Sequence, residues 1–173
     1  MRDYLANEVR NVCLLGHRGA GKSSVVEAML YFTKATERLG KTVDGTSAMD
    51  YDAEEVKRAM SVYTSIAPVE WKDCKINFVD TPGYLDFAGD NALIVVGARD
   101  GVESGTRKAW NVVSERKLPT IFFVNKIDEE NADFDTAYNQ IRDCPKRLHH
   151  TAYDSWHLSL CDHDKNYNKV YLG

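Results

Sequence analysis

The stretch GHRGAGKSS contains the residue types that hold a phosphate group. It fits the spacing G-x-x-x-x-G-K-[ST], in which glycines let consecutive backbone N–H groups point into one concavity. Lys22 would bring a positive charge to the phosphates, and the Ser23 hydroxyl would ligate Mg²⁺. A glycine-rich turn that matches by chance is the alternative. The candidate nucleotide-binding residues are Gly16, His17, Arg18, Gly19, Ala20, Gly21, Lys22, Ser23 and Ser24.

A second motif, D-x-x-G, closes the apolar run in FVDTPG, residues 78–83. Asp80 is predicted to hold Mg²⁺ through a water molecule. The Gly83 N–H would reach the terminal phosphate, because only glycine lets the backbone approach so closely. Alone this motif is weak, since turns after strands often contain Asp and Gly. Downstream of a phosphate loop it becomes much more specific.

The third motif, NKID, covers residues 125–128 and also follows an apolar run. The Asp128 carboxylate can accept hydrogen bonds from guanine N1–H and from the exocyclic amine, whereas adenine offers neither donor there. Such a mismatch costs about 1–3 kcal/mol, so GTP is predicted over ATP. Lys126 can lay its aliphatic stem on the base, and Asn125 can tie this loop to the phosphate loop.

Strand-like and helix-like segments alternate along the chain to Cys144, and they would position these motifs. The expected strands are 9–15, 60–71, 75–80, 92–98 and 120–126. The expected helices are 22–36, with apolar Val25, Ala28, Met29 and Phe32, then 103–117 and 133–144. This order predicts an α/β fold whose mostly parallel sheet has helices on both faces.

Within that fold, a turn at Lys72-Asp73 would make residues 60–80 an antiparallel hairpin. We expect residues 1–145 to form an incomplete GTP-binding domain. Residues 146–173 read as a tail of uncertain structure, in which SWHLSL could add one edge strand.

Composition narrows the classes of function. The net charge of -4 and the pI of about 5.7 argue against broad nucleic-acid binding, and we expect no sequence-specific DNA contact. The four cysteines form no C-x-x-C pair, which favours thiols in a reducing compartment. No apolar run reaches the length that spans a membrane. These features lead us to expect a cytoplasmic protein. We also expect a monomer, although none of these features bears on the oligomeric state.

The three motifs in this order, with the stretches around them, resemble a translational GTPase. Residues 35–62, together with DTPGYLDF, DGVESGTRKAW and NKIDEENADF, are similar to elongation factor G and its elongation-factor-G-like relatives. Tetracycline ribosomal-protection proteins are close relatives in this family. The resemblance spans about residues 7–144 and implies a P-loop NTPase fold that hydrolyses GTP to GDP. It also implies Mg²⁺, the ribosome as partner, and a role as a switch in protein biosynthesis.

Several positions carry over from the resemblance or depart from it. Ser61 stands where the family has a Thr or Ser that ligates Mg²⁺. Tyr84 stands where the family usually has a His that orients the attacking water, and Gly19 stands where many members have Asp. With a pKa near 10, a tyrosine is a poor base and cannot carry the charge of an imidazolium. We therefore name Lys22 and Tyr84 as the catalytic candidates, with a gate or a surface aromatic as alternatives for Tyr84.

The segment after the second motif is short. Only residues 81–91 join the strand that ends at Asp80 to the next apolar run, whereas a parallel crossover needs about a dozen residues or more. The second-switch helix of the family is therefore expected to be shortened. The cause is a real deletion, the joining of two segments across a gap in the sequence, or a damaged reading frame. The resembling family also has an S-A-x loop that contacts guanine, and we assign no residues of this sequence to it.

Two other functions stay open at this stage. One is a truncated or non-hydrolysing GTP-binding module, which the short crossover and Tyr84 favour. The other is an ATP-dependent P-loop kinase, against which Asp128 argues.

Overall fold

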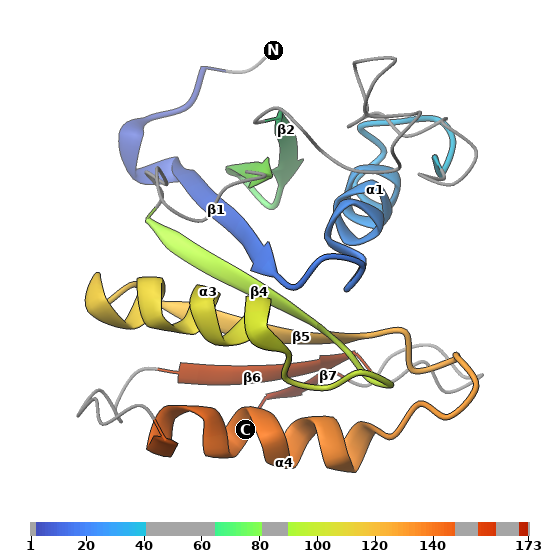
Figure 1. Cartoon of the computed structure of the whole chain (residues 1–173). Helices are drawn as coiled ribbons and strands as arrows, with labels where there is room; N and C mark the ends of the chain where they lie inside the picture. Colours follow the sequence, from blue (N-terminus) through green and yellow to red (C-terminus); the bar gives the residue numbers. More distant parts are fainter. Residues whose placement is uncertain (1–2, 41–64, 81–89, 148–155, 162–169, 173) are drawn as a thin grey trace. The chain divides into compact units, whose positions relative to one another are not determined.

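A computed structural model describes residues 3–40, 65–80, 90–147, 156–161 and 170–172, drawn in colour in Figure 1. The chain divides into two compact units. The first unit comprises Met1–Leu14 and Lys22–Asn91, and the second comprises Leu15–Gly21 and Ala92–Gly173. No helix in the described part of the chain is both long and apolar enough to cross a membrane.

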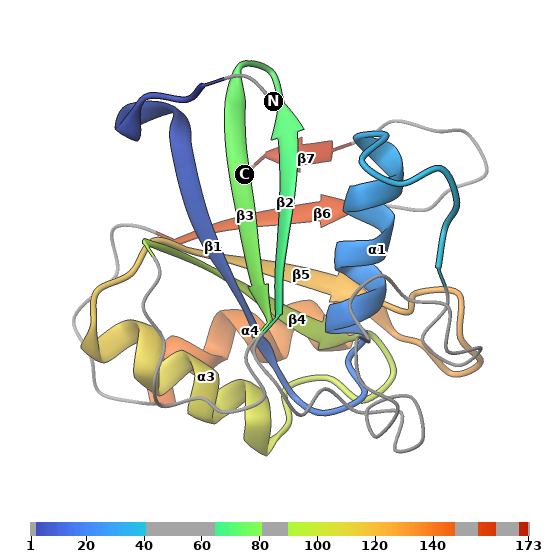
Figure 2. The same cartoon turned by 90° about the horizontal axis from the view of Figure 1, so that it is seen from above.

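The strands of the first unit are β1 (Val9–Gly16), β2 (Ser65–Trp71) and β3 (Cys74–Asp80), and a 3-10 turn, η1 (Ala6–Glu8), precedes β1. The last two residues of β1 are counted with the second unit. β3 pairs in parallel with β1 and antiparallel with β2, as Figure 2 shows. Lys72 and Asp73 join β2 to β3 with φ angles of 43° and 61°. The predicted hairpin and its turn are therefore confirmed, although residues 60–64 of the expected strand lie outside the described residues.

The helix α1 (Lys22–Phe32) packs on β2 and β3. The apolar cluster beneath it consists of Leu14, Val26, Leu30, Ala67, Val69 and Phe78. The expectation that Ala28 and Phe32 lie on the apolar side of this helix was wrong, since Ala28 is exposed and Phe32 is 67% exposed. Phe32 packs instead on Trp71, with 5.2 Å between the ring centroids.

α1 also ends earlier than the predicted Thr36. Lys34 takes a left-handed φ of 59°. The backbone N–H groups of Lys34 and Ala35 donate to the carbonyls of Tyr31 and Leu30, over 3.0 and 2.9 Å. This is the Schellman pattern of helix termination, with lysine in the place that glycine usually takes. The helix therefore ends through the backbone conformation at Lys34, without a glycine or proline there that would have indicated the end in the sequence.

The second unit holds β4 (Asn91–Gly97), β5 (Thr120–Asn125), β6 (Trp156–Cys161) and β7 (Val170–Leu172). β5 pairs in parallel with both β4 and β6, and β7 pairs antiparallel with β6. The strand expected at SWHLSL exists. Its prediction as an edge strand was wrong, because β6 has hydrogen-bonded partners on both sides. The β6–β7 pair adds a second antiparallel pairing that the sequence did not suggest.

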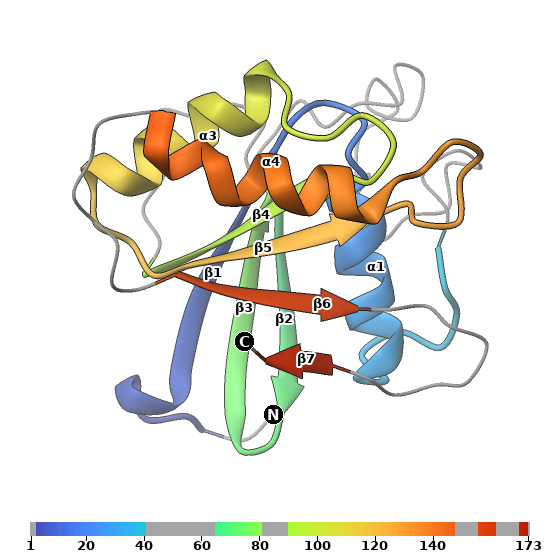
Figure 3. The same ribbon diagram turned by 90° about the horizontal axis from the view of Figure 1, so that it is seen from below.

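Two helices, α3 (Ser104–Glu115) and α4 (Phe134–Arg147), lie side by side in the second unit (Figure 3). Trp110 of α3 is buried against Phe122 of β5, with 5.6 Å between ring centroids. The Asp133 carboxylate caps α4, because it accepts hydrogen bonds from the Thr136 N–H at 3.0 Å and the Thr136 hydroxyl at 2.6 Å.

The expected fold class is confirmed, since strands alternate with helices and most strand pairs are parallel. α4 continues to Arg147, beyond the predicted end at Cys144. The predicted shortening of the second-switch helix falls on residues 81–89, outside the described residues. That helices cover both faces of the sheet stays a prediction.

Candidate nucleotide-binding site

The glycine-rich loop follows β1 and leads directly into α1. Its three glycines have a backbone that other residues resist: φ is 134° at Gly16, 83° at Gly19 and 92° at Gly21. A Cβ on Gly16 would overlap the Val95 carbonyl oxygen, and one on Gly21 would overlap the Asn125 side-chain nitrogen. The loop is therefore packed closely enough to require these glycines. Arg18 and Gly19 are exposed on it, and Ala20 is buried.

In the second unit, the start of the NKID motif touches this loop. Asn125 Nδ2 donates a hydrogen bond to the Ala20 carbonyl over 3.0 Å, so the predicted tie between the two loops is confirmed. Lys126 has a left-handed φ of 62°, and its Nζ lies 2.8 Å from the Glu129 carboxylate. Asp128 follows in the turn after β5 and is exposed. The motif thus holds the phosphate loop at one end and presents a carboxylate at the other.

His17 makes two contacts in the second unit that sequence reasoning did not foresee. Its Nδ1 accepts a hydrogen bond from the Gly105 N–H over 3.3 Å, and its Nε2 lies 3.4 Å from Glu103 Oε1. Both partners belong to the start of α3, and the sequence separation from His17 to Gly105 is 88 residues. Neither periodicity nor motif spacing could have predicted these contacts of His17. Glu103 and Gly105 do lie in DGVESGTRKAW, one of the stretches that carry the family resemblance.

In the first unit, the structure brings together Lys22, Ser23 and Asp80. The Ser23 hydroxyl donates to Asp80 Oδ2 over 3.2 Å, and Asp80 is only 1% exposed at the end of β3. Burial lowers the pKa of Lys22, and the negative charge of Asp80 opposes that shift. The positive end of α1 begins at the same residues, with Ser24 exposed in its first turn.

This donor set fits the groups that the motifs imply. A hydroxyl and a buried carboxylate offer the oxygen ligands that Mg²⁺ prefers. An ammonium group at a helix N-terminus after a glycine-rich loop is suited to phosphate oxygens. Ser61, Gly83 and Tyr84 lie outside the described residues, so their predicted places in the site stay predictions.

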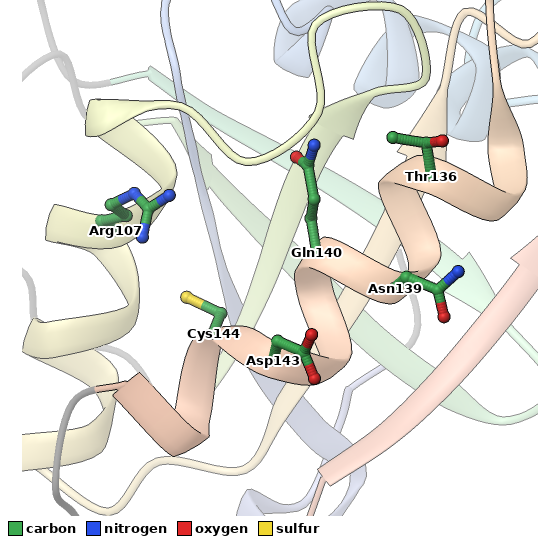
Figure 4. Close-up of a pocket in the computed structure, with 6 residues that line it drawn as sticks. All are labelled: Arg107, Thr136, Asn139, Gln140, Asp143 and Cys144. Atoms are coloured by element: carbon green, nitrogen blue, oxygen red, sulfur yellow. The ribbon is translucent and has the colours of Figure 1, made fainter.

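A separate cavity of about 210 Å³ lies between α3 and α4 (Figure 4). It is lined by Arg107, Thr136, Asn139, Gln140, Asp143 and Cys144. No residue of the three motifs contributes to it, and Gln140 already accepts a hydrogen bond from the Val102 N–H over 2.8 Å. Its mixed lining has no group of cations for a triphosphate, so the motif loops remain the better candidate site.

A strand, a glycine-rich loop with left-handed glycines and a helix that opens on Lys and Ser together define a P-loop nucleotide-binding domain. The sequence pattern of the elongation factor Tu GTP binding domain family matches residues 7–155. The chain therefore belongs to this family, and it is a GTP-binding domain related to those of the translational GTPases.

Relatives support the same conclusion. The chain is 34% identical to tetracycline resistance protein TetO of Campylobacter jejuni over 144 residues, which cover 78% of this chain and 22% of that protein. It is also 34% identical to the TetM protein from transposon Tn1545 of Enterococcus faecalis, over 79% of this chain and 23% of the relative. The resemblance inferred from the sequence is thereby confirmed. The chain spans less than a quarter of the length of these relatives.

A solved structure agrees with the fold. A crystal structure of a protein from Thermus thermophilus superposes with a TM-score of 0.71 at 36% identity. The match covers 82% of this chain and 22% of that protein.

Proposed function

We propose that this domain binds GTP and GDP with Mg²⁺ and hydrolyses GTP as a switch linked to protein synthesis on the ribosome. The observation that carries the proposal is the meeting of Ser23 and Asp80, 3.2 Å apart, beside the buried ammonium of Lys22. Membership of the elongation factor Tu GTP binding domain family supports it.

In this proposal the phosphate loop supplies main-chain N–H groups, and Lys22 binds the β- and γ-phosphates. Burial disfavours the charge on Lys22, so an incoming polyanion would relieve an electrostatic cost already present in the fold. Ser23 would ligate the metal directly, and Asp80 would hold it through water, with Ser61 added in the GTP state. When bound, Mg²⁺ supplies charge neutralisation at the phosphate oxygens.

Recognition of the base is assigned to the NKID motif. Asp128 would accept two hydrogen bonds from guanine, and the aliphatic stem of Lys126 would lie against the ring. Asn125 does not contact the base in this scheme. It holds the Ala20 carbonyl, so that base recognition and phosphate binding share one framework.

For hydrolysis, the residues of the second motif have separate roles. The Gly83 N–H would bind the γ-phosphate, and the Tyr84 hydroxyl would contact the attacking water. A tyrosine can orient water by a hydrogen bond but is a poor proton acceptor at neutral pH. We therefore propose hydrolysis that is slow alone and accelerated by the ribosome.

The setting of the domain is also proposed. The chain covers only 22–23% of the relatives' length, so the ribosome as a partner is part of this proposal. We place the protein in the cytoplasm as a monomer, with no membrane or DNA partner. We keep residues 1–145 as the incomplete GTP-binding domain, because every proposed nucleotide contact lies before the end of α4.

Calorimetry with GDP, GTP and ATP in the presence of Mg²⁺ tests the binding proposal. We expect heat from both guanine nucleotides and a much weaker signal from ATP. Lys22→Ala should remove the heat while the protein stays folded. Equal affinity for ATP and GTP would contradict the guanine assignment, and no heat from either guanine nucleotide would contradict the proposal as a whole.

Single-turnover hydrolysis, with and without ribosomes, tests the enzymatic part. We expect a faster time course with ribosomes. Tyr84→Phe should slow it if the hydroxyl orients the water, whereas a gating aromatic would tolerate the change. A flat time course with ribosomes present would favour the non-hydrolysing module, which Tyr84 already makes a competing candidate.

A further inference from the structure

His17 stands within the phosphate loop, and its carbonyl accepts a hydrogen bond from the Ala20 N–H of the same loop, yet the two described contacts of its imidazole leave the loop. The Gly105 N–H donates to Nδ1 over 3.3 Å, and Nε2 faces Glu103 Oε1 over 3.4 Å. The imidazole is 32% exposed and the Glu103 side chain 35% exposed, so this is a half-buried contact. Loop and helix start are thus joined through one side chain.

These contacts fix where the proton of a neutral imidazole belongs. Since Nδ1 accepts from a backbone N–H, it carries no proton, and the proton lies on Nε2. Nε2–H then points at a carboxylate oxygen, which accepts it. One tautomer therefore satisfies both contacts, and the opposite tautomer would satisfy neither.

We propose that His17 is a positioning residue, which fixes the phosphate loop against the start of α3 in the conformation that binds nucleotide. This inference rests on the proposed function, since it concerns the same site. The loop needs such fixing because glycines give its backbone more freedom than other residues would. Asn125 holds the loop at Ala20, three residues beyond His17, so the two side chains secure both halves of its bend.

Two near-isosteric variants separate the two contacts. In His17→Asn, the side-chain oxygen can replace Nδ1 as the acceptor for the Gly105 N–H, but the side chain cannot reach Glu103. In His17→Gln, the side-chain amide can donate to Glu103, but the Gly105 N–H loses its acceptor. His17→Ala loses both contacts. The readout is the release rate of a fluorescent GDP analogue. We expect increases of about 2-fold for Asn, about 5-fold for Gln and about 10-fold for Ala.

The partner side provides the second test. Glu103 precedes α3 but makes no side-chain capping hydrogen bond, so Glu103→Ala should act mainly through His17. We expect about 2-fold faster release in the wild-type background and no further increase in His17→Ala. Glu115→Ala, at the far end of the same helix, is the matched control and should leave release unchanged.

Spectroscopy gives a readout that does not depend on bound nucleotide. In nitrogen-15 spectra of the nucleotide-free protein, we expect the Nε2–H tautomer of His17. The Gly105 amide resonance should shift in His17→Gln and stay close to the wild type in His17→Asn. The opposite tautomer would overturn the proposal, even if the alanine variant does not fold.

The outcomes also separate this inference from the proposed function. If the wild type binds no guanine nucleotide, the proposed function fails. If the wild type binds and His17→Ala releases GDP at the wild-type rate, only the positioning role fails. Additive effects of Glu103→Ala and His17→Ala would likewise refute it. A purely structural role would lower the melting temperature of the nucleotide-free protein and leave release unchanged.

Discussion

The contact between Gly21 and Asn125 allows a sharp test of how the phosphate loop is held. Gly21→Ala places a methyl group where the Asn125 side-chain nitrogen now lies. That nitrogen is the donor to the Ala20 carbonyl, so the substitution should break the tie between the two loops. It also forces an alanine to adopt a φ of 92°.

The magnitude follows from these two effects. A left-handed backbone costs a residue with a Cβ about 1–2 kcal/mol, and loss of a neutral hydrogen bond costs about 1 kcal/mol. Gly21→Ala should therefore lower the free energy of unfolding by about 2–3 kcal/mol, and Asn125→Ala by about 1 kcal/mol. The double variant should lose only about 2–3 kcal/mol, because the hydrogen bond is lost once and the clash disappears.

Equilibrium urea unfolding of the nucleotide-free protein, followed by the fluorescence of buried Trp110, measures these values. Gly19→Ala is the matched control: its φ is 83°, but a Cβ there would meet no atom within 4 Å. It should lose only the backbone cost of about 1–2 kcal/mol. Equal losses for the two glycine variants, or strict additivity of Gly21→Ala and Asn125→Ala, would refute the reasoning.

Three further predictions concern charged groups. Asp128→Asn should weaken GTP binding about 100-fold and favour xanthosine triphosphate, whose base carries an oxygen in place of the amine; competition binding measures both. Lys22→Met should weaken GDP binding about 10- to 100-fold in calorimetry. Because burial lowers the pKa of Lys22, wild-type stability relative to this variant should rise as pH increases through the lowered pKa toward 10.5. Hydrogen bonds from Thr136 lower the pKa of Asp133 below its usual 3.8, so its stabilising effect is present above that value and lost as pH falls through the lowered pKa. Asp133→Ala should thus lower the melting temperature at neutral pH but not at a pH below the lowered pKa.

Local chemistry explains what the sequence predicted well. The turn at Lys72-Asp73 separates two strand-like runs, which pair antiparallel with Trp71 opposite Cys74. The tie from Asn125 to the phosphate loop was foreseen because a side-chain amide can donate a hydrogen bond to a backbone carbonyl, as Asn125 does to that of Ala20. These predictions needed only strand order and residue type.

The buried side of α1 could not be predicted in the same way. The helix carries apolar residues on more than one side, so periodicity alone left two choices. Val26 and Leu30 are buried because Phe78 and the β2 side chains Ala67 and Val69 face them. Glu27 lies between these positions and is only 1% exposed, which composition would not suggest. The side of α1 that is buried is therefore determined by its packing against β2 and β3.

The partners of His17 show the same limit at the site itself. A histidine in the second position of a glycine-rich loop suggests a contact with phosphate, yet the described contacts of its imidazole are with Glu103 and Gly105. The loop's N–H groups can converge on a phosphate only if the loop is held before the ligand arrives. In this chain the phosphate loop is held by the side chains of His17 and Asn125, neither of which the pattern G-x-x-x-x-G-K-[ST] specifies. Asn125 belongs to the base-recognition motif, so a change there should weaken phosphate binding as well as guanine selectivity. Affinities for inorganic pyrophosphate and for GDP should therefore fall together in Asn125→Ala, whereas Asp128→Asn should spare pyrophosphate.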